Sequence, residues 1–246
     1  MVNLTDQNTL DPMNYNLGES SKHFIIHQQD DLFIAHEHLF QTDIPTRFYH
    51  HQADTFLFLI KGELYLQQGA QQNLQSNEQE TALKQHQGIW LEAHTINSIT
   101  LLTPTVELCL IRLKNTEQTE LRGSFKKISS GTVESILGRS HIKTWPLWHG
   151  KAGQITIELY PPQFKETLYY QKSATQYLLP LSGITFISNE NKISKPCPSF
   201  GKVLARREPR AISNPNSESI TVLSVMTTQK TIGRVLLLTK PETKIR

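Results

Sequence analysis

The sequence has little cysteine and no long apolar run. Its two cysteines, Cys109 and Cys197, lie far apart without Cys-x-x-Cys spacing, so neither a disulfide framework nor a thiolate metal site is expected. No stretch approaches the roughly 18 apolar residues that span a membrane as a helix. The polar first 20 residues lack the basic start and apolar core of a signal peptide. We therefore expect a cytoplasmic protein that does not bind membranes.

Charged residues are also scarce, at 19% of 246 residues, whereas hydrophobic residues make up 37%. This composition is typical of a folded chain with two small domains or one large one. The net charge of +3 is unevenly distributed, with −8 over residues 1–123 and +11 over residues 124–246. The opposite charges predict that the halves dock on each other or on a second copy as a homodimer, or that the basic half binds an anion. The basic residues are scattered and no recognition motif accompanies them, which argues against nucleic acid.

One segment occurs twice in the chain. Residues 48–66, FYHHQADTFLFLIKGELYL, align without a gap on residues 169–187, YYQKSATQYLLPLSGITFI, when Gly62 is set on Gly183. A repeat of this kind predicts one small fold built twice. Strand-like runs, short and rich in β-branched and aromatic residues, cover 32–40, 55–66, 88–93, 98–102, 105–113, 154–160, 175–187, 201–207, 219–227 and 233–239. The chain is therefore predicted to be all-β, as a sandwich or barrel.

The repeat and the polar segments suggest a domain organisation. We predict a polar N-terminal arm over 1–24, a first barrel over 25–118, a linker over 119–140 and a second barrel over 141–246. Within the linker, TVESIL (132–137) is the best candidate for a short helix. The polar inserts 67–87 and 189–200 are predicted to be loops.

Two motifs in the first half resemble those of a known family. The stretch HHQADTFLFLIKGELYL is similar to the first motif of the cupin superfamily, in which His-x-His and acidic residues precede an apolar strand and Gly-Glu. GIWLEAHTINSI resembles the second cupin motif, in which Gly opens a strand that leads to a turn and a His. Together with the repeat, the chain from about residue 25 to 240 resembles a bicupin, with two tandem double-stranded β-helix (jelly-roll) barrels.

The resemblance also locates the positions where cupins bind metal. In metal-binding cupins, two His and one Glu of the first motif and one His of the second hold a divalent ion. These four positions fall on Phe48, His50, Thr55 and Asn97 in the first half, and on Tyr169, Gln171, Gln176 and Arg210 in the second. One imidazole does not hold a divalent metal usefully without other donors. The metal motifs are thus degenerate, and we expect no tightly held metal.

The same positions predict what the barrels bind instead. His50, Thr55 and Asn97, with Phe48 as an apolar wall, form a neutral polar pocket for a sugar-like or small polar ligand, with His50 as the best catalytic candidate. In the second barrel, Tyr169, Gln171 and Gln176 lie near the basic segment KVLARREPR. Its Arg207 and Arg210 carry planar forks that suit a carboxylate or phosphate.

Three hypotheses of function stay open at this point. The first is a bicupin that binds a small polar or anionic molecule without metal, as a sensor, a carrier or an enzyme. The second is a metal-dependent cupin enzyme, a dioxygenase or isomerase, that holds a divalent transition metal with the shifted set His36, His38, His50 and His94. The third is a degenerate cupin that acts in assembly or regulation.

Overall fold

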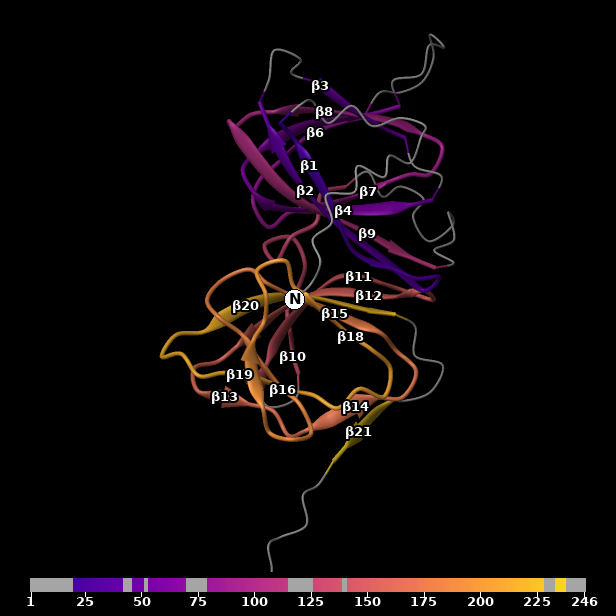
Figure 1. Cartoon of the computed structure of the whole chain (residues 1–246). Coiled ribbons are helices and arrows are strands. Elements are labelled where there is room, and N and C mark those ends of the chain that lie inside the picture. The colour runs from indigo at the N-terminus through magenta and orange to yellow at the C-terminus, as the bar shows by residue number, and fades with distance from the viewer. Residues whose placement is uncertain are drawn as a thin grey trace, which may run out of the picture. The chain divides into compact units, whose positions relative to one another are not determined.

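The computed structural model describes residues 20–41, 46–50, 53–69, 79–114, 126–138, 141–227 and 233–237, with only the backbone described for 46–50. Over these ranges the regular structure is β-strand (Figure 1). None of the described segments forms a helix long and apolar enough to cross a membrane. The chain divides into two compact units, residues 1–134 with 150–152 and residues 135–149 with 153–246. Each unit is described by itself below.

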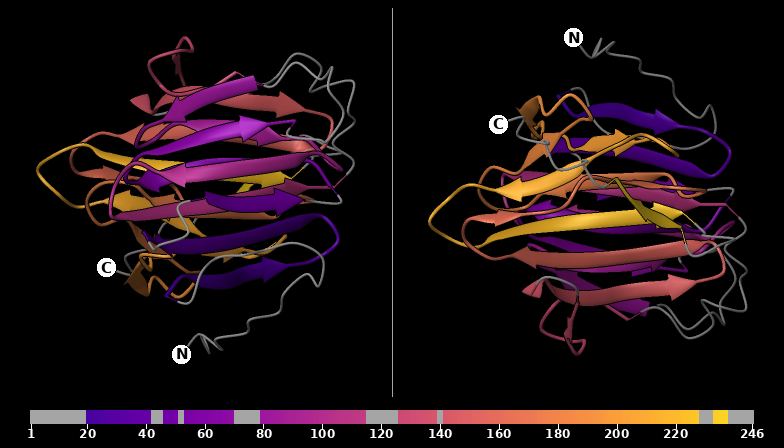
Figure 2. Two further views of the ribbon diagram at one scale, coloured as in Figure 1. Left: turned by 90° about the horizontal axis from the view of Figure 1, so that it is seen from above. Right: turned by 90° about the horizontal axis from the view of Figure 1, so that it is seen from below.

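The first unit is built from two antiparallel sheets. The five-stranded sheet has the order β1 (Lys22–Gln28), β2 (Leu32–Phe40), β9 (Thr105–Leu113), β4 (Thr55–Lys61) and β7 (Gly88–Leu91). The four-stranded sheet has the order β3 (Thr46–His50), β8 (Ile96–Leu101), β5 (Leu64–Gln68) and β6 (Gln79–Leu83). Figure 2 shows these strands as indigo to magenta arrows.

The second unit repeats this plan. Its largest sheet has the order β10 (Ile136–Leu137), β11 (Lys143–Gly150), β12 (Gly153–Tyr160), β20 (Ile220–Thr227), β15 (Gln176–Pro180) and β18 (Lys202–Leu204). A second sheet has the order β13 (Phe164–Lys165), β19 (Ala211–Asn214), β16 (Phe186–Ser188) and β17 (Ser194–Pro196), and β14 (Tyr169–Gln171) pairs with β21 (Arg234–Leu236). The order β11-β12-β20-β15-β18 matches β1-β2-β9-β4-β7, and β13-β19-β16-β17 matches β3-β8-β5-β6. The prediction of an all-β chain with two jelly rolls is confirmed.

The glycines that anchor the sequence repeat make equivalent turns. Gly62 lies between β4 and β5 with φ at 88°, and Gly183 lies between β15 and β16 with φ at 65°. Residues other than glycine rarely adopt this left-handed backbone conformation. The run 55–66 therefore folds as two strands, and the run 175–187 does so as well.

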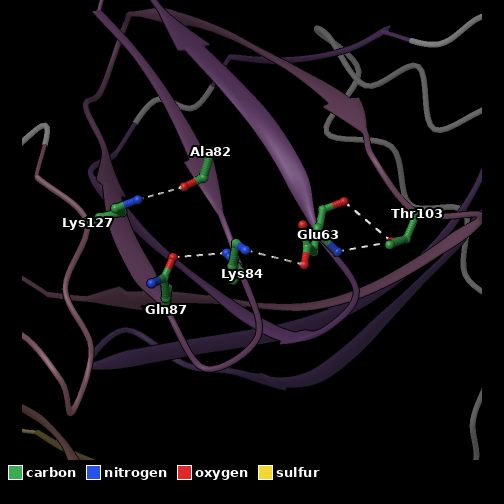
Figure 3. Close-up of polar contacts among 6 residues, drawn as sticks. All are labelled: Glu63, Ala82, Lys84, Gln87, Thr103 and Lys127. Carbon is green, nitrogen blue, oxygen red and sulfur yellow. Dashed lines mark hydrogen bonds and ion pairs between the residues drawn. The ribbon is translucent and has the colours of Figure 1, made fainter.

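Polar contacts fix the Gly62 turn in the first unit (Figure 3). The backbone N–H of Glu63 donates to Thr103 Oγ1 at 3.0 Å, and the Lys84 ammonium lies 3.9 Å from the Glu63 carboxylate. Lys127 Nζ donates to the carbonyl oxygen of Ala82 at 3.3 Å, which joins the segment after β9 to β6. These contacts connect the Gly62 turn to the turn that carries Thr103 and to the residue that follows β6.

Alternate residues along each strand make the two cores. In the first unit a cluster of buried aliphatic side chains fills the space between the sheets: Ala35, Leu39, Leu57, Leu59, Leu64, Leu66, Leu83, Ile89, Leu91, Ile99, Leu101, Val106, Leu108 and Leu110. The corresponding cluster of the second unit contains Tyr160, Phe164, Leu178, Ile187, Cys197, Leu204, Ile212, Ile220 and Val222. Successive side chains of a strand point to opposite faces. A residue two positions from a core residue on the same strand therefore also points inward.

Two local predictions are wrong. Residues 132–137 form no helix, because Ile136 and Leu137 make strand β10, which pairs antiparallel with Thr144 and Lys143 of β11. The inserts 67–87 and 189–200 are not loops throughout. Each contributes an outer strand, β6 and β17, whose backbone bonds to β5 and β16 outweigh the polar composition of its sequence.

Candidate functional site

A cluster of polar side chains lies on the inward face of the second unit. Along β12, Thr156, Glu158 and Tyr160 alternate with Ile155 and Ile157. Tyr160 belongs to the core cluster of this unit, so the alternation turns Thr156 and Glu158 toward the same interior. The neighbouring strand β20 places Ser224 directly opposite Thr156.

Glu158 is held by three hydroxyl groups. Tyr160 Oη donates to its carboxylate at 2.5 Å and Thr156 Oγ1 at 3.2 Å, and the Ser224 hydroxyl also bonds to it. Burial raises the pKa of Glu158, and these three bonds only partly offset that effect. Burial, together with the carboxylate of Glu158, also raises the pKa of Tyr160. Glu158 is therefore a buried carboxyl group with a raised pKa that lies among three hydroxyl groups.

A second carboxyl group, that of Glu166, follows β13. Its Oε1 accepts a bond from Arg234 Nη2 at 3.0 Å, and its Oε2 accepts one from the backbone N–H of Ile212 at 3.1 Å. The Glu166 side chain is 5% exposed. Burial raises the pKa of Glu166 to about 7, even though Arg234 favours the charged form.

Tyr169 joins two arginines to this cluster. The strand β14 pairs with β21 on one side, and on its other side the backbone of Tyr169 exchanges hydrogen bonds with that of Arg210, at 2.7 and 2.9 Å. The Cζ atom of Arg234 lies 3.8 Å from the centre of the Tyr169 ring and that of Arg210 lies 5.5 Å from it. These distances fit cation–π contacts. Burial raises the pKa of Tyr169 above its usual range.

Arg210 is the most unusual member of the cluster because it is 0% exposed. Its Nη1 donates to the backbone carbonyl oxygens of Ala205 at 3.0 Å and Glu208 at 3.3 Å. Its Nε and Nη2 are buried without a hydrogen-bond partner, and Arg234 Nε is in the same state. Nε and Nη2 form one edge of the guanidinium fork, the edge that binds a carboxylate through two parallel bonds.

The sequence-predicted residues of the second barrel converge on this cluster, with one exception. Tyr169, Gln171, Gln176 and Arg210 are all buried, at 3%, 6%, 5% and 0% exposure. Gln171 pairs with Arg234 across the β14–β21 ladder, and Gln176 Nε2 donates to Ser224 Oγ at 3.2 Å. Arg207, in contrast, is exposed in a turn after β18.

In the first unit, Thr55 and Asn97 are both fully buried and lie in line with the core residues of β4 and β8. Thr55 Oγ1 accepts a bond from Arg112 Nε at 3.0 Å and donates to the carbonyl oxygen of Ala53 at 3.0 Å. Asn97 pairs with Tyr49 across the β3–β8 ladder, whereas His50 pairs with Ile96. The side chains of Phe48 and His50 lie outside the described residues, so the predicted pocket around His50 stays a prediction.

The shifted histidine set does not come together in the described residues. His36 and His38 alternate with Ala35 and Leu39 of the core, so they face away from the interior of the first unit. Burial lowers the pKa of His36 to about 3, helped by His38. His94 is exposed in a turn after β7. Within the described part of the chain there is no group of three or more His, Cys, Asp or Glu side chains arranged for a metal ion.

Comparisons with known proteins identify the fold. No model of a protein family matches the sequence, and no curated protein matches it. Solved structures do match over most of their length. A cupin 2 conserved barrel domain protein from Leptotrichia buccalis has a TM-score of 0.62 at 13% identity, covering 86% of this chain and 91% of that one. The Lactobacillus farciminis oxalate decarboxylase, in complex with formate, has a TM-score of 0.60 at 10% identity, covering 91% and 86%.

Vicilin from hazelnut, Corylus avellana, also matches, with a TM-score of 0.63 at 10% identity and the same two coverages, 91% and 86%. The chain has the bicupin fold. At these identities the likeness concerns the fold alone. The matches include oxalate decarboxylases and storage globulins, so the bicupin fold by itself selects neither chemistry.

The residues that the cupin resemblance places at the metal positions of the second barrel do not fit a divalent metal. Tyr169, Gln171, Gln176 and Arg210 stand there, and none of them is an imidazole, a thiolate or a carboxylate. The buried guanidinium of Arg210 brings positive charge to the place where a cation would bind. The nearby carboxyl groups of Glu158 and Glu166 are engaged by hydroxyls and by Arg234.

Sequence reasoning missed the carboxyl and guanidinium groups of Glu158, Glu166 and Arg234 and the hydroxyl residues that surround Glu158, namely Thr156, Tyr160 and Ser224. One signal was available for Glu158. Glu37 and Glu158 are separated by the same number of residues as Gly62 and Gly183, so extending the repeat alignment back to β2 superposes the two glutamates. Glu166 and Arg234 lie in short segments whose position depends on how β13, β14 and β21 fold, and no local pattern marks them.

Proposed function

We propose that the second barrel of this bicupin binds a small anionic molecule, a carboxylate, without a tightly held metal. The free Nε–Nη2 edge of Arg210 is the observation that supports the proposal. An unmade hydrogen bond on a buried polar group costs about 1–3 kcal/mol, and more on a charged one. A carboxylate relieves two such penalties at once because its two oxygens match the fork.

The charge balance of the cluster favours an anion. Two guanidiniums, of Arg210 and Arg234, share the cluster with two carboxyl groups whose pKa values are raised by burial. When either glutamate holds a proton, the cationic groups are in excess. A small anion then neutralises a charge that is otherwise buried and only partly compensated.

The comparison with the L. farciminis enzyme adds support of a coarser kind. That oxalate decarboxylase was solved with formate, a small carboxylate. The likeness to it establishes the fold only, so the ligand class proposed for this bicupin rests on Arg210.

The two cysteines bear on where the protein acts. Cys109 and Cys197 are buried and are not joined in a disulfide. We propose on this basis that the protein works in a reducing compartment, the cytoplasm.

Calorimetric titration with formate, acetate and oxalate tests the carboxylate proposal. We expect at least one of the three to bind the unaltered protein, and Arg210→Met to weaken that binding by about 30-fold or more, as for the loss of charge-assisted bonds. Arg207→Met is the matched control because it removes an exposed arginine three residues away, and its affinity should stay within about twofold of the unaltered protein.

Two results would overturn the proposal: no binding of any of the three acids, or equal affinity in Arg210→Met. Circular dichroism of each variant checks folding. If Arg210→Met does not fold, Arg210→Lys keeps the charge but loses the planar fork. It should still bind more weakly than the unaltered protein, and equal affinity would again contradict the proposal.

A further inference from the structure

We propose that the anion carries a hydroxyl group, so that the site takes a small hydroxy acid whose hydroxyl donates to Gln176 Oε1 while its carboxylate lies on Arg210. The inference rests on the proposed carboxylate binding and narrows its ligand class. Gln176 is 5% exposed, and its Oε1 is a buried acceptor without a hydrogen-bond partner.

The hydrogen bonds of the Gln176 amide show which of its ends is free. Nε2 donates to Ser224 Oγ at 3.2 Å, whereas Oε1 has no hydrogen-bond partner. Oε1 is therefore the amide atom that is left for a ligand, and it is an acceptor.

Gln176 lies across the sheet from the segment that holds the Arg210 side chain. Gln176 is the first residue of β15 and pairs with Leu204 of β18. The next residue, Ala205, supplies the carbonyl oxygen that holds Arg210 Nη1. Backbone positions paired across antiparallel strands lie about 5 Å apart. Gln176 and the carbonyl oxygen that holds Arg210 thus belong to adjacent points of one barrel wall.

The chemistry of these groups selects a hydroxyl. Gln176 Oε1 is a neutral acceptor and calls for one donor hydrogen. An ionised second carboxylate has only acceptors and would leave Oε1 unsatisfied. An ammonium would add positive charge beside the guanidiniums of Arg210 and Arg234. A hydroxyl supplies a donor without adding charge.

Matched pairs of acids test the inference by calorimetry: glycolate against acetate, and lactate against propionate. We expect the hydroxy acid of each pair to bind the unaltered protein about 10-fold or more tightly, because the analogue without a hydroxyl leaves Oε1 unpaired. In Gln176→Met this preference should fall to about twofold or less. Gln163→Met, which alters an exposed glutamine of the same unit, should keep the full preference.

The outcomes separate this inference from the proposed function. If acetate and glycolate bind equally to the unaltered protein, the hydroxy-acid inference is wrong and carboxylate binding stands. If no acid binds, the proposed function itself fails. Tighter binding of glycine than of glycolate would overturn the choice of a hydroxyl over an ammonium. These comparisons need no variant, so they hold even if Gln176→Met does not fold.

Discussion

Leu57 in the first barrel and Leu178 in the second occupy equivalent positions of the repeat, but their neighbours differ. Leu57 of β4 pairs with Leu110 on one side and with Ile89 on the other. Leu178 of β15 pairs with Ser224. The first barrel thus has aliphatic side chains beside Leu57, whereas the second barrel has the hydroxyl group of Ser224 beside Leu178. A shared strand order does not dictate a shared interior, because inward positions can exchange apolar for polar residues without changing backbone pairing.

The equivalent glutamates Glu37 and Glu158 also have different neighbours in the two barrels. Glu37 of β2 lies opposite Leu108, and Glu158 of β12 lies opposite the equivalent Val222. Glu37 is 0% exposed, and its Oε1 lies 2.9 Å from His23 Nδ1 of β1. Glu158 instead receives bonds from hydroxyl groups. One barrel thus pairs its glutamate with an imidazole, whereas the other surrounds it with hydroxyl groups.

The largest expected effect comes from truncating the equivalent leucines. Leu57→Ala should lower the free energy of unfolding by about 3–4 kcal/mol, because it opens a cavity with only apolar walls. Leu178→Ala should cost about 1 kcal/mol less, since water can enter its cavity and bond to Ser224. Urea unfolding of each variant measures the difference. Equal losses would show that the polar residues of the second barrel do not hydrate the cavity.

The turn glycines offer a comparison of backbone strain. A Cβ at Gly62 would lie 2.5 Å from the backbone oxygen of Thr105, whereas at Gly183 it would meet a side-chain methyl of Ile220 at 2.6 Å. Both positions have positive φ, but a methyl group can move and a strand carbonyl cannot. We expect Gly62→Ala to cost about 2–3 kcal/mol and Gly183→Ala about 1–2 kcal/mol. Thermal unfolding should rank them in this order, and the reverse order would contradict the strain argument.

The fold could be predicted from the sequence because the repeat marks equivalent positions in the two barrels. Gly62 and Gly183 mark equivalent left-handed turns, and the apolar alternation around them specifies the strands that pack inward. The positions of Tyr169, Gln171, Gln176 and Arg210 followed from the repeat and from the cupin resemblance. What these residues do did not follow, because the free edge of Arg210 depends on the carbonyls of Ala205 and Glu208 and on side chains far away in sequence.

The second barrel should also respond to pH through Glu166. Its pKa is raised from 4.5 to about 7 by burial, so between these values the folded state binds more protons than the unfolded state. Stability contributed by this group is therefore present below about pH 4.5 and is lost as pH rises toward 7. We expect the free energy of unfolding to fall by about 1–3 kcal/mol more between pH 5 and 8 in the unaltered protein than in Glu166→Gln.

Urea unfolding at several pH values measures this difference. Glu218→Gln is the control because Glu218 is exposed in the same unit, and its curve should run parallel to that of the unaltered protein. If Glu166→Gln runs parallel as well, Glu166 does not hold its proton in the folded state.

The smallest expected effect concerns Tyr177, whose equivalent in the first barrel is Phe56. Both side chains are 0% exposed, and Tyr177 Oη donates to the carbonyl oxygen of Phe200 at 2.9 Å. Tyr177→Phe makes the second barrel like the first and should cost about 1 kcal/mol, because it leaves that acceptor without this bond. Tyr65→Phe is the comparison, since it removes an exposed bond to Glu80 and should cost less than Tyr177→Phe. Chemical unfolding of both variants decides the point: a loss for Tyr177→Phe no larger than that for Tyr65→Phe would mean that water replaces the hydroxyl, and that the second barrel admits solvent beyond its polar cluster.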